Sequence, residues 1–376
     1  MAGGEGGWEP DRPWREIVTG GADRLRPEPP VRDAWRELTQ QPAVCVKQLT
    51  GANLDTTRRW RVAGTDLGIP YLLENGSVGF LFGDTFASAW PEDGDDWRSP
   101  VMLRSNVHPA APGGIVFDSA ARVQGDGRAP QLMDYMHFRK PFANRDAEIT
   151  RIPNDGVSFP ETGRQVLSYM AVYDWPPNQP WLTGRAGLAY SDNGNDFHDV
   201  PAATWPNDAA NVDPYQMWTM QRDRRFVYVF SVRAGRQQGP MMLRRVPWQR
   251  ILEPEAYEPF GWRKETGWRW GQPCTSVLQE APFGEPSVRL LRDGVWAMTY
   301  SLPRGIVSRR AERPEGPWSY PKVQLTDVEL PALYGGFIHP YSTSAVGDLH
   351  LTVSTWLQDP PGTSRTYHVS QYAGTL

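Results

Sequence analysis

The chain has 376 residues, a length that suits either two ordinary domains or one large all-β domain. Its formal net charge is −4 and no segment gathers Lys and Arg, so the sequence lacks the electrostatic footprint of a nucleic-acid-binding protein. Aromatic residues make up 12% of the chain, including 17 Trp, and Gly and Pro number 36 each. This mixture is typical of many short strands joined by tight turns, and it predicts an all-β fold.

The beginning of the chain differs from the rest. Residues 1–45 are polar and rich in Gly, Pro and Arg, and we expect them to form an N-terminal extension. One segment, 31–41, carries Val31, Trp35 and Leu38 at helical spacing. The first residues lack the pattern of a secretory signal, and no segment matches a membrane-spanning helix. We therefore expect no membrane insertion, while the localisation stays open and includes delivery by a phage or a lysis system.

From residue 46 to residue 376, short β-rich segments alternate with turn signals, and we expect one propeller domain there. The clearest strands lie within 77–86, 166–175, 225–232, 294–302, 348–356 and 366–373. Two of them are followed by a second strand that carries paired arginines, at 241–247 and 305–312. This recurrence indicates stacked β-meanders, as in the blades of a propeller, with a β-sandwich as the main alternative.

Two aspartates flank the strongest hairpin signal of the chain. Asp66 lies nine residues before Asn75-Gly76, and Asp84 lies eight residues after it. A three-residue loop centred on Asn75 would place both acids on one face of the hairpin, whereas a two-residue loop would place them on opposite faces. Gly68 and Pro70 are compatible with a bulge, so the register stays open.

Two neighbouring carboxylates in different environments can together cleave a glycosidic bond. Strand periodicity puts Asp84 on the same face as Phe80 and Phe82, which should raise its pKa above that of Asp66. We therefore expect Asp84 to act as the general acid and Asp66 as the base or nucleophile. The alternative is structural, because a buried Asp often caps backbone N–H groups in a turn.

Further polar and aromatic residues are candidates for binding a sugar. Arg104 and Asn106 suit vicinal hydroxyls or a carboxylate, and Trp side chains can stack on sugar rings. Each candidate could equally be a locally bonded loop residue or a core tryptophan. The predicted substrate-binding residues are Arg104, Asn106, Trp218, Glu285, His339 and Tyr341, with Trp90 and Trp175 as further stacking candidates.

The two cysteines, Cys45 and Cys274, are too few for a disulfide framework and unsuited to a zinc site. We expect two buried thiols, with one bridge as the alternative. The sequence contains no HExxH, Walker A, GxGxxG or GxSxG motif, so metalloprotease, nucleotide-binding and α/β-hydrolase functions have no support.

An ordered set of segments carries a family resemblance. Asp66, FGDTF, RSN, GLAYSDNG, VYVFSVRAGRQQGPMMLRRVP, GEPSV with WAMTYS and GPWS, and HPYS with LTVSTW follow one another over about residues 50–374. The set resembles a family long described as a domain of unknown function and now associated with endo-D-arabinanases. The resemblance implies a five-bladed β-propeller that hydrolyses D-arabinan of mycobacterial-type cell walls, namely arabinogalactan and lipoarabinomannan. It also implies that Asp66 and Asp84 are catalytic, with Arg104, Asn106, Glu285 and His339 in binding or supporting roles.

We accordingly predict an endo-acting glycoside hydrolase of internal α-linked D-arabinofuranosyl bonds, with a polysaccharide as its partner. No organic cofactor is required for this chemistry and no metal ligand is assigned, although the sequence leaves open a Ca²⁺ ion in the propeller channel. The alternative functions are a non-catalytic carbohydrate-binding propeller and a protein-interaction scaffold, which would present a large exposed apolar patch. The oligomeric state is undetermined by the sequence.

Overall fold

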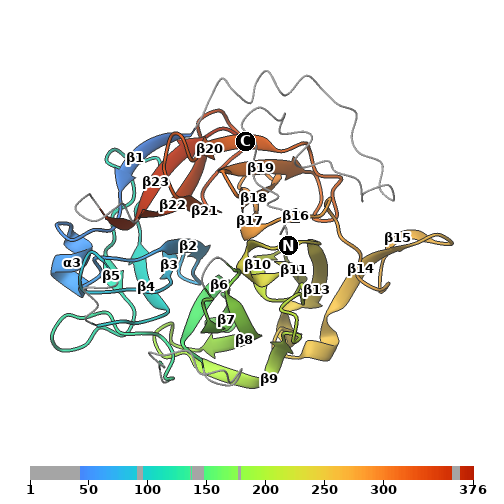
Figure 1. Cartoon of the computed structure of the whole chain (residues 1–376), viewed down its shortest axis with the longest axis horizontal. Helices are drawn as coiled ribbons and strands as arrows, with labels where there is room; N and C mark the ends of the chain where they lie inside the picture. The colour runs from blue at the N-terminus through green and yellow to red at the C-terminus, as the bar shows by residue number, and fades with distance from the viewer. Residues whose placement is uncertain (1–42, 91–95, 136, 138–147, 177–178, 358–364) are drawn as a thin grey trace.

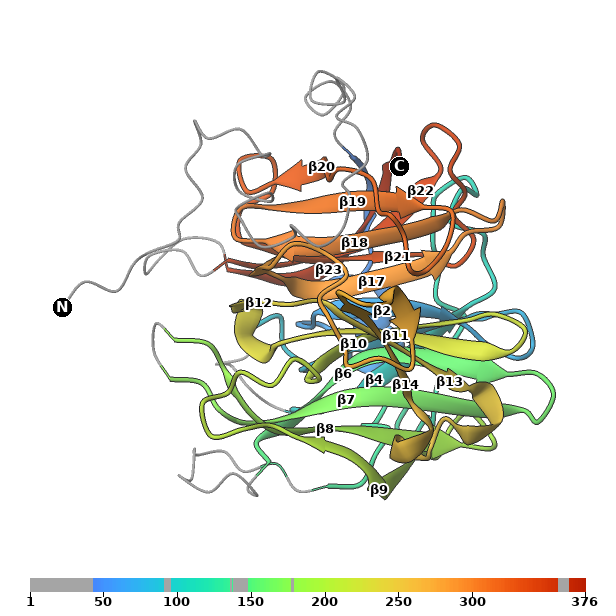
Figure 2. The ribbon, with the colours of Figure 1, turned by 90° about the vertical axis from the view of Figure 1, so that its right-hand side faces the viewer.

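The structure is a computed structural model that describes residues 43–90, 96–135, 137, 148–176, 179–357 and 365–376. Five antiparallel sheets of four or five strands surround a common centre, as Figure 1 shows from above and Figure 2 from the side. The prediction of an all-β, five-bladed propeller is confirmed. The helix expected over 31–41 lies outside the described residues, as does most of the expected extension.

Each blade is a meander whose first strand lies innermost. The first blade contains β2 (Leu67–Leu72), β3 (Val78–Phe82), β4 (Val101–Ser105) and β5 (Ser119–Ala120). The second contains β6 (Thr150–Phe159), β7 (Arg164–Asp174), β8 (Leu182–Ser191) and β9 (His198–Pro206). The third contains β10 (Met217–Arg222), β11 (Phe226–Val232), β13 (Met242–Pro247), β14 (Glu258–Arg263) and β15 (Gly267–Trp270). The fourth contains β17 (Gly284–Leu290), β18 (Trp296–Leu302), β19 (Gly305–Ala311) and β20 (Lys322–Thr326).

The fifth blade joins the two ends of the described chain. It contains β21 (Leu333–Ile338), β22 (Leu349–Leu357), β23 (Thr366–Gly374) and, as its outer strand, β1 (Val44–Gln48). Because β1 pairs with β23, a strand from the start of the chain completes the last blade and closes the ring. The remaining elements are short: α3 (Asp55–Trp60), the 3₁₀ turns η2 (Ala234–Arg236), η3 (Trp248–Arg250) and η4 (Pro254–Ala256), and the pair β12 (Gln238–Gly239) and β16 (Ala281–Pro282). No helix in the described ranges is long and apolar enough to cross a membrane.

Five of the six strands that the sequence predicts most clearly occupy equivalent positions. They are the second strands of the five blades, β3, β7, β11, β18 and β22, and the sixth, β23, is the third strand of the fifth blade. A second strand lies between two others and has neighbouring blades on both faces, so nearly every residue of it is buried. Its sequence is therefore a continuous apolar run, which is the easiest strand pattern to recognise. The arginine-bearing segments form β13 and β19, the third strands of their blades.

A buried ion pair links the blades at the centre. Arg289 of β17 donates to both carboxylate oxygens of Asp155 of β6, at 2.8 Å each. The same guanidinium donates to the carbonyl oxygen of Pro70 of β2 at 2.9 Å, and Asp155 accepts from the backbone N–H of Met220 of β10 at 2.8 Å. Four innermost strands are thereby tied together, and each buried charge has several partners.

Both cysteines are free, so the bridge is absent. Cys274 is half-buried, but Cys45 is exposed, so the expectation of two buried thiols is wrong for Cys45. The reason is its position in β1, an outer strand whose residues are mostly exposed.

Candidate active site

The hairpin that carries the two aspartates has the register expected for a three-residue loop. The loop comprises residues 74–76, between the paired ends of β2 and β3. A bulge at Gly68 shifts the register, so that Asp66 lies opposite Gly83, whose N–H donates to the Asp66 carbonyl oxygen at 3.3 Å. Asp84 follows directly. The chain reversal therefore brings both acids to the same end of the first blade.

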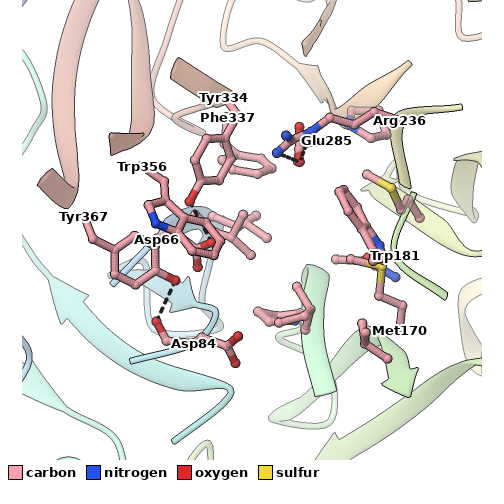
Figure 3. A pocket seen from close by; sticks show the side chains of 18 of the residues that line it. Asp66, Asp84, Met170, Trp181, Arg236, Glu285, Tyr334, Phe337, Trp356 and Tyr367 are labelled. Atoms are coloured by element: carbon pink, nitrogen blue, oxygen red, sulfur yellow. Dashed lines mark hydrogen bonds and ion pairs between the residues drawn. The ribbon is translucent and has the colours of Figure 1, made fainter. Parts of the chain in front are cut away.

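Both acids line a pocket of about 800 Å³, a size that suits a drug-sized ligand. The pocket lies where the innermost strands begin, and Figure 3 shows Asp66 and Asp84 on one side of it, with Met170 and Trp181 on the other. Neither acid forms an ion pair with an arginine in the described part of the chain. The structural alternative was a buried Asp whose carboxylate caps backbone N–H groups in a turn. Asp66 and Asp84 instead line a pocket.

Four of the innermost strands contain a β-bulge next to a residue that lines this pocket. The register of β2, β6, β17 and β21 shifts close to the lining residues Leu67, Asn154, Glu285 and Tyr334. Leu67 and Glu285 have positive φ values, 63° and 29°, in which residues with a side chain are strained. Strain of this kind persists only where surrounding contacts enforce it, and it is concentrated at functional sites.

Asp66 is held by a tyrosine and has one unpaired oxygen. The Tyr334 hydroxyl donates to Oδ2 at 2.9 Å, whereas Oδ1 is buried and has no hydrogen-bond partner among the described residues. The pKa of Asp66 is raised to about 8, mainly by burial and also by the negative charges of Asp84 and Glu285, while the Tyr334 hydroxyl opposes the shift. At neutral pH this side chain is therefore mostly a neutral carboxylic acid.

Asp84 has better hydrogen-bonding partners. Its Oδ1 accepts from Trp97 Nε1 and from Thr150 Oγ1, at 2.7 Å each. Burial raises its pKa to about 6, and these two bonds limit the rise because they stabilise the ionised form. The Tyr367 hydroxyl donates to the Asp84 carbonyl oxygen at 3.0 Å and fixes the backbone (Figure 3).

The relative pKa values reverse our expectation from the sequence. Phe80 and Phe82 were expected to raise the pKa of Asp84 above that of Asp66, but Asp66 has the higher value. The reason is tertiary: Asp84 receives two side-chain hydrogen bonds, one from another blade, whereas Asp66 lies near two other carboxylates. The roles follow the pKa values, so Asp66 is suited to the acid and Asp84 to the base.

Glu285 lies in the same pocket and is paired. Arg236 donates from Nε and Nη2 to Glu285 Oε1, at 2.8 and 2.5 Å. The guanidinium of Arg236 also lies over the rings of Trp181 and Tyr334, 5.2 and 4.8 Å from their centroids. Glu285 is therefore a fixed negative charge near Asp66, and its Oε2 is buried without a hydrogen-bond partner in the described ranges.

The tryptophan candidates divide between pocket and core. Trp218 and Trp175 line the pocket; Trp218 is almost fully buried and donates to the Tyr215 carbonyl oxygen at 2.6 Å, whereas Trp175 is 42% exposed. Trp90 does not line the pocket and is buried beside Trp356. Of the three, Trp175 has the most exposed face.

Four other candidates lie outside the lining of this pocket, and each has partners of its own. Arg104 donates to the Gly194 carbonyl oxygen at 2.5 Å, and Asn106 donates to Asp118 Oδ2 at 3.2 Å. His339 is buried and accepts from the N–H of Tyr341 at 3.2 Å, while the Tyr341 hydroxyl donates to the Gly76 carbonyl oxygen. None of these four residues lines the pocket that contains Asp66 and Asp84, so the structure does not place them where they were predicted to bind the substrate.

Sequence reasoning missed several residues that contact the acids. They are Trp97, Thr150, Tyr334, Tyr367 and, through Glu285, Arg236. Only Tyr334 has a local signal, because it precedes Gly335 and Gly336, both at positive φ, in a bulge of β21. Trp97 lies in the first blade, 13 residues after Asp84, whereas Thr150, Tyr367 and Arg236 come from other blades and approach through closure of the ring.

No group of three or more His, Cys, Asp or Glu side chains is placed to hold a metal ion in the described ranges. Asp155, the buried carboxylate at the centre, is already paired with Arg289. Because backbone carbonyl and amide oxygens also bind Ca²⁺, the ion in the channel stays a prediction from the sequence.

Comparisons with known proteins agree with this architecture. Residues 51–373 match the model of the family described as "Domain of unknown function (DUF4185)". Among curated proteins, notoamide biosynthesis cluster protein J of Aspergillus sp. (strain MF297-2) is 48% identical over 342 residues, 89% of this chain and 90% of that protein. Protein J′ of Aspergillus versicolor is 48% identical over 343 residues, 89% of this chain and 93% of that protein.

Solved structures share the fold at low sequence identity. A putative hydrolase from Bacteroides ovatus has a TM-score of 0.56 at 14% identity, covering 94% of this chain and 97% of its own. An α-L-arabinofuranosidase from Podospora anserina has a TM-score of 0.50 at 13% identity, covering 89% and 97%. A family 117 glycoside hydrolase from Zobellia galactanivorans has a TM-score of 0.50 at 12% identity, covering 89% and 91%. At these identities the likeness concerns the fold alone.

Proposed function

This chain belongs to the DUF4185 family, and we propose that it is a glycoside hydrolase that cleaves internal α-linked D-arabinofuranosyl bonds. The observation that carries the proposal is the pair of acids in one pocket, with pKa values of about 8 for Asp66 and about 6 for Asp84. Around pH 7 such a pair holds one protonated and one ionised carboxyl, the combination that acetal cleavage needs.

The roles follow from the surroundings of each acid. Asp66 donates its proton to the glycosidic oxygen that leaves, while Tyr334 holds the carboxyl in place. Asp84 acts from its ionised form, either removing a proton from water or attacking the anomeric carbon. Trp97 and Thr150 keep its Oδ1 occupied, so the other oxygen is left for the reaction.

Glu285 has an electrostatic role in this scheme. Its charge raises the pKa of Asp66 and so helps to keep the acid protonated. The pairing with Arg236 fixes the Glu285 carboxylate near the site. Both residues act through Asp66, so we regard them as positioning residues.

D-Arabinan is the polymer that the family resemblance of the sequence favours, as arabinogalactan or lipoarabinomannan. The names of the two fungal relatives favour a second candidate, a small glycoside that belongs to a biosynthetic product. Both candidates require the same acids. They differ in what lies on the other side of the scissile bond.

The test is a digest of arabinogalactan by the purified protein, with L-arabinan and galactan as parallel substrates. We expect oligoarabinosides from the wild type, no turnover from Asp66→Asn or Asp84→Asn, and retained polymer binding by both variants. The matched control is Asp192→Asn, which alters an exposed aspartate that is paired with Arg164 away from the pocket. Unchanged hydrolysis by both variants would remove this site assignment. Polymer binding without hydrolysis by the wild type would favour a carbohydrate-binding propeller instead.

A further inference from the structure

Two exposed tryptophans line the pocket that contains the acids. Among the tryptophans of the described ranges, only Trp175 and Trp356 are exposed, at 42% and 50%, and both belong to the pocket lining. A large apolar side chain that stays in water forgoes the free energy of burial, so its exposure at a binding pocket indicates a ligand that covers it. The two side chains are therefore candidates for direct contacts with the substrate.

The two tryptophans occupy equivalent positions in two different blades. Trp175 directly follows β7, the second strand of the second blade, and Trp356 is the last residue but one of β22, the second strand of the fifth. In a propeller of antiparallel meanders, the second strands all run in the same direction relative to the ring and end on the same face. The equivalence explains why both indoles reach one pocket although 181 residues separate them in the chain.

The acids lie between these two positions. The second strand of the first blade is β3, which ends at Phe82, and Asp84 follows two residues later. Figure 1 shows the first blade between the fifth and the second. The order around the ring is therefore Trp356, the two acids and Trp175. The shorter path between the two tryptophans crosses the acids.

Contacts with neighbouring rings hold Trp356 close to Asp84. The centroid of the Trp356 ring lies 5.5 Å from that of Tyr367 and 6.2 Å from that of Trp90. Tyr367 in turn donates its hydroxyl to the Asp84 carbonyl oxygen, and Figure 3 shows Trp356 and Tyr367 on the side of the pocket that carries the acids. A ring that is already fixed loses little side-chain entropy when a ligand binds, which suits it to stacking.

We propose that Trp356 and Trp175 are stacking platforms for two sugars of one arabinan chain, one on each side of the scissile bond. The proposal rests on the proposed glycosidase activity and adds the path of the chain, from the fifth blade across the first to the second. On each indole lies the apolar face of a furanose ring, while the hydroxyls of that ring stay in water. Sugars bound on both sides of the acids favour cleavage within a chain over cleavage at its end.

The test is the cleavage pattern of a linear α-(1→5)-linked D-arabinofuranosyl octasaccharide that is labelled at one end. Trp356→Ala weakens binding on one side of the acids and Trp175→Ala on the other, so the main cleavage position should move in opposite directions along the octasaccharide. Each variant should also lower kcat/KM about tenfold. A wild-type pattern in both variants, or a shift in the same direction, would overturn the proposal.

Conservative variants and a distant tryptophan provide the controls. Trp356→Phe and Trp175→Phe keep an aromatic ring, so they should keep most of the wild-type pattern. Trp262→Ala removes a half-buried tryptophan of β14 that does not line the pocket, and it should leave the pattern unchanged. Phe variants that shift the pattern as far as the Ala variants do would show that stacking is not the contact, and the platforms would be removed.

The behaviour of the wild type separates this proposal from the proposed function. Hydrolysis with an unchanged pattern in both Ala variants would leave the glycosidase standing and remove the platforms. If the wild type hydrolyses none of the octasaccharide, the glycosidase is removed, and calorimetric titration with the same octasaccharide decides the rest. Binding that is about tenfold weaker in both Ala variants would then support the platforms as a carbohydrate-binding site, whereas equal binding by all three proteins would remove them.

Discussion

Replacing Asp66 with Asn should stabilise the protein while abolishing its activity. The pKa of Asp66 rises from 3.8 to about 8 on folding, because the charged form is buried and lies near Asp84 and Glu285. At about 1.4 kcal/mol per pKa unit, this shift of roughly four units corresponds to at most about 6 kcal/mol of destabilisation at alkaline pH. Water in the pocket screens the charge and Asn must also be desolvated, so we expect a gain of about 2 kcal/mol.

The sign of the pH dependence follows from the raised pKa. Between pH 3.8 and about 8 the folded state binds more protons at Asp66 than the unfolded state does. The stability of the wild type therefore falls as the pH rises through this window, and it levels off above pH 8. The advantage of Asp66→Asn should be small near pH 4 and largest above pH 8.

Thermal unfolding of both proteins at several pH values measures this effect. For a chain of 376 residues, a gain of about 2 kcal/mol raises Tm by about 2 to 3 °C. The control is Asp155→Asn, which leaves Arg289 buried without its carboxylate and should cost about 3 to 5 kcal/mol. A loss of stability in Asp66→Asn above pH 8, or a gain that does not vary with pH, would show that Asp66 is ionised in the folded protein.

Three further predictions concern the activity of the same pair. The rate of hydrolysis against pH should be bell-shaped, falling below about pH 6 as Asp84 is protonated and above about pH 8 as Asp66 ionises; a profile flat from pH 5 to 9 would contradict these roles. Tyr334→Phe removes the bond that lowers the pKa of Asp66, so the alkaline limb should move to higher pH while kcat falls roughly tenfold. Gly83→Ala should reduce kcat more than tenfold with little change in circular dichroism, since a Cβ at Gly83 would collide with Asp66 Oδ1; wild-type kcat would show that the carboxyl is free to move.

The sequence by itself determined the parts of this protein that local patterns encode. Second strands of blades are buried on both faces and read as apolar runs, so the β-meanders were recognisable one by one. The Asn75-Gly76 signal located the hairpin that carries Asp66 and Asp84, and the glycine at position 68 allowed for the bulge that the structure contains. These features depend on residues close together in the chain.

Only the tertiary structure decided how the two acids differ. Thr150, which lowers the pKa of Asp84, comes from the second blade, and Tyr334 and Glu285, which act on Asp66, come from the fifth and fourth. Closure of the ring brings these groups together, and no spacing along the chain encodes it. A pKa depends on the burial and charges around a group, so the flanking phenylalanines alone gave the wrong order for the acids.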